Sequence, residues 1–230
     1  MPEWQITPSE YFKRLDLDIS QLEEKLNLPS IEEITKIIPL RDIHKITSLV
    51  PMSFDLLLYL LRKIPTLDGR YPFTETSISM TRMDPRNLKI GQKFVYRENY
   101  LGLLEEVPDI FQRFAVTPGG LGDLGAYFVF GLNGNNEPAL ACYMPPIIEK
   151  HGSDLIVMDG IHRDYIGKQT GLALTVIVAE NISLPFPCSA KSWSDIKVIS
   201  LSEKPKDINE RYFDLKKELF RDLKYLGIDG

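Results

Sequence analysis

Two apolar segments flank one short polar segment in the second half of the chain, and this arrangement constrains the fold most. Residues 155–159 read LIVMD and residues 172–180 read LALTVIVAE, both rich in the side chains of buried strands. Between them, IHRDYIGKQT has the length of a helix of about three turns and is followed by Gly171, a residue typical of helix ends. The pattern predicts a strand, a tight turn, a helix and a central strand.

Other strands are predicted on either side of short turns. AYFVFGL (126–132) and PALACYM (138–144) flank NGNN, which is a strong hairpin signal, and PPIIEK (145–150) is followed by the turn HGSD. A further strand is expected near Lys93 to Arg97, then a short helix that ends near Pro108. The expected fold is α/β or α+β, with a mixed sheet built mainly from residues 90 to 180.

The first 65 residues are predicted to form a separate helical section. Thr7, Ser20 and Ser30 each stand three residues before a Glu, a spacing typical of helix starts, and prolines separate the segments. The run Leu56–Leu61 is far shorter than the roughly 20 apolar residues that a membrane span needs, so a buried helix is expected there. Residues 66–230 would form the mixed domain.

The end of the chain is predicted to be an amphipathic helix over 207–226. Its apolar residues recur at spacings of three and four (Ile208, Tyr212, Leu215, Leu219, Leu223, Leu226). Packing on the protein's own sheet is the expected use of this stripe, and a homodimer contact is the alternative.

Composition excludes several classes of protein. Lys plus Arg is 27 and Asp plus Glu is 32, giving a net charge of -5, so binding of nucleic acid through bulk charge is not expected. The two cysteines, Cys142 and Cys188, are too far apart for a C-x-x-C metal or redox site. The first residues do not resemble a signal peptide, so the cytoplasm is the expected location.

Gly120, Gly122 and Gly125 form a literal G-x-G-x-x-G. A dinucleotide site needs this motif between a strand and a helix. Here it leads into the predicted strand 126–132, so a flexible loop is the preferred interpretation.

The residues with most chemical content are Asp159, Gly160, Ile161, His162 and Arg163, where the strand turns into the helix. Free N–H groups and the positive end of a helix dipole form a ready anion site there. A guanidinium in the first turn suits phosphate or carboxylate. A simpler alternative is that Asp159 caps the helix, His162 is a surface histidine, and Arg163 pairs with Asp159 or Asp164.

The stretch 145–180, and the DGIHR signature within it, resembles the core of the ParB/sulfiredoxin-like superfamily, which includes the DGQHR proteins and free-serine kinases. The resemblance implies phosphate binding by Gly160, His162 and Arg163, with Asp159 matching an acidic residue of the DGQHR and kinase variants. Ile161 stands within the signature where sulfiredoxin has its catalytic Cys, which disfavours sulfinic-acid reduction. No second DNA-binding helical segment of the ParB type follows the core.

The expected function is therefore binding of a nucleotide (ATP, ADP or CTP) or another phosphorylated ligand through residues 160–163, with phosphoryl transfer or nucleotide hydrolysis as the reaction. Asp159 or His162 would act as the base, and Asp159 could hold Mg²⁺ beside the phosphates. An acid outside the signature would come from Glu98, Glu105 or Glu106. The alternatives are a non-catalytic module that binds DNA or protein through the same fold, and a scaffold with a vestigial signature.

Overall fold

The computed structural model describes residues 4–17, 33–113 and 124–228, with side chains in the helix 97–113 described as far as Glu105. The chain divides into two compact units. The first unit contains Met1–Pro65, Gly125–Met144 and Asp222–Gly230, and the second contains Thr66–Leu124 and Pro145–Arg221. The chain thus passes between units near residues 65, 124, 144 and 221, where the sequence predicted one boundary at residue 65.

The first unit is built on a four-stranded sheet in the order β1-β7-β6-β2. Its elements are α1 (Pro8–Leu15), β1 (Lys36–Ile37), η2 (Leu40–Asp42), β2 (Ile43–Pro51), α3 (Phe54–Arg62), β6 (Tyr127–Asn133), β7 (Pro138–Tyr143) and η8 (Leu223–Leu226). The predicted helices at Thr7 and at Leu56–Leu61 are confirmed, and the Thr7 hydroxyl accepts a hydrogen bond from the Glu10 N–H at 3.3 Å. The starts predicted at Ser20 and Ser30 lie outside the described residues.

The prediction of a purely helical N-terminal section was wrong. Residues 43–51 form β2, which pairs antiparallel with β6. The partner strand begins at Tyr127, far along the chain, so local capping patterns carried no information about this pairing. The hairpin of β6 and β7 is confirmed, with Asn133 to Asn136 in the turn.

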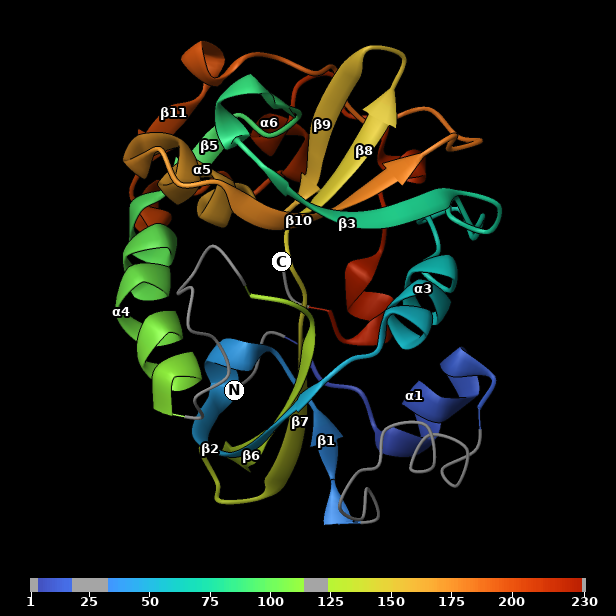
Figure 1. Ribbon diagram of the computed structural model, residues 1–230, viewed down its shortest axis with the longest axis vertical. Coiled ribbons are helices and arrows are strands. Elements are labelled where there is room, and N and C mark those ends of the chain that lie inside the picture. Colours follow the sequence, from blue (N-terminus) through green and yellow to red (C-terminus); the bar gives the residue numbers. More distant parts are fainter. Residues whose placement is uncertain (1–3, 18–32, 114–123, 229–230) are drawn as a thin grey trace. The chain divides into compact units, whose positions relative to one another are not determined.

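The second unit contains a five-stranded mixed sheet in the order β3-β10-β8-β9-β4 (Figure 1). Its strands are β3 (Ser77–Met83), β4 (Lys89–Ile90), β8 (Ile147–His151), β9 (Asp154–Asp159) and β10 (Leu174–Glu180), while β5 (Phe94–Tyr96) and β11 (Lys197–Ile199) form a separate parallel pair. Its helices are η3 (Pro85–Asn87), α4 (Arg97–Arg113), α5 (Ile161–Thr170), η5 (Trp193–Asp195), η6 (Leu201–Glu203), α6 (Ile208–Arg211) and η7 (Lys217–Leu219).

These elements confirm the α/β or α+β fold class and the predicted series of strand, helix and strand over 154–180. β10 lies inside the sheet, between β3 and β8. The five-stranded mixed sheet is built mainly from residues 89–180, as expected, but β3 precedes residue 90 and the hairpin of β6 and β7 belongs to the other unit's sheet. The helix expected to end near Pro108 continues to Arg113, since an internal proline removes one backbone hydrogen bond without necessarily ending a helix.

The amphipathic helix predicted over 207–226 does not form. This segment contains only the short helices α6, η7 and η8, each of three or four residues. Its backbone bonds to other loops instead, as when the Lys93 N–H donates to the Arg211 carbonyl and the Phe213 N–H to the Gly91 carbonyl. These bonds replace helical i→i−4 bonds, so the continuous apolar stripe proposed for a homodimer is absent.

Helix α5 is held against the five-stranded sheet by an apolar core. Ile161 of the helix packs with Leu88, Ile90, Val95, Ile148, Val157, Leu174, Val176, Val178 and Trp193, all buried. The Trp193 indole N–H donates to the Pro85 carbonyl at 2.8 Å, which satisfies its one polar atom inside the core. The start of α5 therefore has a fixed position relative to the end of β9.

Candidate functional site at the strand-to-helix turn

The turn between β9 and α5 requires glycine. Gly160 has φ +87° and is the residue that precedes the helix, and a Cβ there would lie 2.8 Å from the Pro146 Cα. Both the left-handed backbone and the close approach exclude a larger residue. No side chain of the described residues caps the start of α5, so the first-turn N–H groups are not covered there by the usual Ser, Thr, Asp or Asn oxygen.

Asp159 and Arg163 lie together beneath this turn. Their side chains are 9% and 7% exposed, and an Arg163 guanidinium nitrogen is 3.5 Å from Asp159 Oδ2. Burial raises the pKa of Asp159, while the Arg163 charge opposes this rise. The simpler alternative from the sequence, in which Arg163 pairs with Asp159, is therefore correct for this pair. The Arg163 guanidinium contributes its charge from a buried position.

Asp164 is a buried carboxyl that the sequence reasoning left as an ion-pair partner. Its side chain is fully buried, and neither carboxyl oxygen has a hydrogen-bond partner within the described part of the chain. Burial, helped by the nearby Asp159 charge, holds the pKa of Asp164 well above its usual range against the opposing effect of Arg163. Its spacing of three from Ile161, which places both residues on the inward side of the helix, is the signal that could have identified it.

His162 serves to hold the helix in place. Its Nε2 accepts a hydrogen bond from the Tyr96 N–H at 3.1 Å, at the junction of β5 and α4. Burial, with smaller effects from the Arg163 and Lys204 charges, lowers the pKa of His162 to about 4. Because Nε2 is the acceptor, the proton of the neutral ring is assigned to Nδ1, and the lone pair that a general base needs is already engaged.

Two residues beside this turn have buried polar atoms without a hydrogen-bond partner among the described residues. In the described part of the second unit, the buried side-chain oxygens or nitrogens lacking a hydrogen bond belong to Tyr96 and Asp164. These two residues flank His162, Tyr96 by the hydrogen bond to its ring and Asp164 along the helix. Native proteins rarely leave such groups unpaired, and the exceptions are often functional.

The C-terminal segment brings further cations to the same place. Lys204 Nζ lies 5.3 Å from the centre of the Tyr96 ring, and the Arg211 charge opposes the rise in the Tyr96 pKa that burial causes. Arg211 is held by the Pro205 and Lys206 carbonyls. Sequence analysis did not identify Lys204 or Arg211, because only the folding of residues 204–211 beside β5 places them here.

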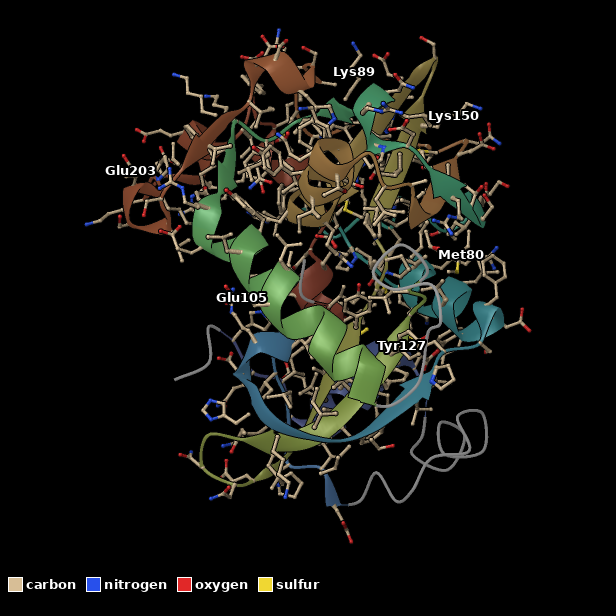
Figure 2. The ribbon with its side chains drawn as sticks, turned by 60° about the vertical axis from the view of Figure 1, so that its left-hand side comes forward. Met80, Lys89, Glu105, Tyr127, Lys150 and Glu203 are labelled. Carbon is tan, nitrogen blue, oxygen red and sulfur yellow. The ribbon has the colours of Figure 1, made fainter. Side chains whose placement is uncertain are left out.

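The predicted acids outside the signature have other positions. Glu98 is exposed and accepts hydrogen bonds from the Ser200 hydroxyl and the Leu201 N–H, each at 2.7 Å, which lowers its pKa. Glu105 is exposed on α4, and Figure 2 labels it there. The side chain of Glu106 lies outside the described residues. Glu98 therefore caps η6, and among the described residues neither Glu98 nor Glu105 forms a hydrogen bond or ion pair with the β9–α5 turn.

No group of three or more His, Cys, Asp or Glu side chains suited to a metal occurs among the residues that the structure describes. His151 pairs with the buried Glu149 at 2.8 Å. Asp159 would hold Mg²⁺ only together with oxygens from a ligand. Gly120 and Gly122 of the glycine motif lie outside the described residues, and Gly125 stands two residues before β6.

No family model, curated protein or solved structure matches the chain. The resemblance to ParB/sulfiredoxin-like proteins therefore stays a prediction that depends on the residues of the signature. Within the described residues, no helix has both the length and the apolar composition to cross a membrane.

Proposed function

We propose that the β9–α5 turn binds a phosphorylated ligand, with ATP, ADP and CTP as the first candidates, and that any reaction there is phosphoryl transfer. The observation that carries the proposal is the uncapped start of α5 at Gly160, above Arg163. Phosphate binds to such helix ends through backbone N–H groups and the helix dipole. The DGIHR resemblance supports the same ligand class.

The charge at the turn also favours an anion. Because the Asp164 carboxyl keeps its proton to higher pH than an ordinary aspartic acid, Asp159 and Arg163 are left as an approximately neutral pair. The helix end and the Lys204 ammonium then add positive potential. Asp164 and Arg163 are buried, so they act on the ligand through their charge state, and the N–H groups of residues 161–163 would make the contacts.

For catalysis, Asp159 is the stronger candidate base of the two predicted residues. The His162 Nε2 is engaged with Tyr96, whereas Asp159 stands at the carboxyl end of its strand, where it would orient a Mg²⁺ or an acceptor hydroxyl beside the phosphates. In this scheme His162 is a positioning residue that fixes α5 against β5.

A site-resolved titration tests the binding step. ¹⁵N-labelled protein is titrated with inorganic phosphate, pyrophosphate, ATP, ADP and CTP, each with and without Mg²⁺. We expect the largest changes in the amide signals of Ile161, His162 and Arg163. Signals that move only elsewhere, or no response to any of these anions, would overturn the proposal.

Paired variants test the charges. Asp159→Asn removes a negative charge, so nucleotide binding should persist or tighten, whereas Arg163→Gln, which removes the positive charge, should weaken it. Arg86→Gln is the matched control, because Arg86 forms an exposed pair with Asp84. A nucleotide at about 100 times its Kd should raise the melting temperature of the wild type by roughly 5–10 °C. Equal shifts in the Arg163→Gln and Arg86→Gln proteins would show that Arg163 does not take part.

Duplex DNA separates the alternative function. A module that reads nucleic acid should bind duplex with an affinity that falls steeply as salt rises. Tight, salt-dependent binding of duplex, with no effect of mononucleotides, would favour that alternative over a nucleotide site.

A further inference from the structure

The edge strands of the two larger sheets differ in how well they are protected against pairing with another strand. β1 and β4 each have two residues, and β2 has two register irregularities and ends at a proline. Short length, bulges and proline are the usual features that stop an edge from accepting a further strand. β3 has none of them: its seven residues contain no proline or glycine and pair with β10 without a register shift.

β3 lies at the margin of its sheet, beside β10 alone among the described strands (Figure 1). Ser77, Ser79, Met80, Thr81 and Arg82 are exposed. Met80 is 37% exposed although its neighbour across the ladder, Ile177, is fully buried. The strand therefore presents a long, regular and largely uncharged edge.

The direction of the backbone groups follows from the neighbouring ladder. The Ile177 N–H donates to the Pro146 carbonyl at 2.8 Å, so the polar backbone groups of Ile177 face β8. Met80 lies opposite Ile177 in the antiparallel pair with β3, and this pair is consequently a non-hydrogen-bonded one. The N–H and C=O of Met80, and by the alternation those of Ile78, point away from β10 toward the edge.

We infer that β3 is a homodimer contact, in which two copies of this chain pair their β3 strands antiparallel about a two-fold axis at Met80. In this register Met80 faces Met80 as a hydrogen-bonded pair, Ile78 faces Arg82, and Ser79 faces Thr81. The same strand supplies both sides, as an isologous interface requires.

The side chains are self-complementary in that register. The single charged residue, Arg82, faces an apolar partner and not a second Arg82, and its guanidinium donates to the Ala173 carbonyl of its own chain at 3.0 Å. Ser79 and Thr81 bring two hydroxyls into cross-strand reach, and the two Met80 side chains cover one another. Since one strand pair buries less than a standard interface, the dimer should be weak and dependent on concentration.

The test combines mass and hydrogen exchange on the full chain. Sedimentation equilibrium over a hundredfold range of protein concentration should show a monomer that becomes a dimer. At the dimer-forming concentration, the amides of Ile78 and Met80 should gain protection, while those of Ser79 and Thr81, already bonded to β10, should change little. A protein that stays monomeric throughout, or protection without this alternation, would overturn the inference.

Met80→Lys places two like charges on the axis, so dimerisation should weaken by at least tenfold while the melting temperature of the monomer stays close to that of the wild type. Ser153→Lys adds the same charge at the exposed turn between β8 and β9 and should leave the dimer unchanged. A dimer that survives Met80→Lys would place the contact elsewhere and refute the inference. These outcomes are independent of nucleotide binding at the β9–α5 turn.

Discussion

The protonation of His162 should limit the stability of the second unit in acid. The folded protein lowers the pKa of this ring from 6.5 to about 4, mainly by burial, and Nε2 accepts a hydrogen bond from the Tyr96 N–H that a protonated ring cannot accept. The unfolded chain therefore binds the proton more readily than the folded chain. The stabilisation is complete above about pH 6.5 and is lost as the pH falls toward 4.

The size of the effect follows from that difference. Each pKa unit corresponds to about 1.4 kcal/mol, so the full shift is worth about 3 kcal/mol. Because the ring is partly exposed, solvent screening reduces this figure, and we expect a loss of roughly 2 kcal/mol between about pH 7 and pH 4.5. Other groups titrate in this range, so the quantity that matters is a difference between two proteins.

The reference protein is His162→Gln, whose amide oxygen can accept the Tyr96 N–H without titrating. Urea unfolding of both proteins at several pH values gives the free energy of unfolding of each. The wild type should lose about 2 kcal/mol relative to the variant on going from about pH 7 to pH 4.5. A difference that does not change with pH would show that His162 is not buried in solution or does not accept the Tyr96 N–H there.

Three further predictions concern buried groups and backbone. Arg221 donates to both carboxylate oxygens of Glu149 at 2.9 Å, and both residues are buried. Arg221→Met should therefore lower the free energy of unfolding, measured in urea, by about 3–5 kcal/mol, and adding Glu149→Leu should recover most of that loss. An unchanged stability in the Arg221→Met protein would contradict this. Because the pKa of Asp164 is raised in the folded protein, the unfolded chain releases this proton at lower pH than the folded chain does, so the wild type should lose stability relative to Asp164→Asn as the pH rises above the ordinary value of 3.8. A stability difference between the two proteins that does not change with pH would contradict this. Gly160→Ala should destabilise the protein by at least about 1 kcal/mol more than Gly69→Ala does, because Gly69 shares a positive φ but has open space around it. Equal losses would mean that Pro146 moves aside without a loss of stability.

Local signals determined the elements whose partners lie nearby in the chain. The hairpin turn over 133–136, the strand that ends at Asp159 and the helix closed by Gly171 were all predicted from turn residues and apolar runs, and the structure confirms them. The same reasoning failed at residues 43–51 and 207–226. In the first case a strand more than seventy residues away provides the pairing, and in the second, bonds to loops such as 91–93 replace helical ones.

The candidate site shows the same division. The sequence alone placed Asp159, Gly160, His162 and Arg163 at a strand-to-helix turn, because their order in the chain fixes that neighbourhood. Only the tertiary structure decided what each side chain meets: His162 meets the Tyr96 N–H, and Arg163 lies buried beside Asp159. Burial and desolvation set the charge state of these groups, and both depend on segments distant in sequence, which local periodicity cannot encode.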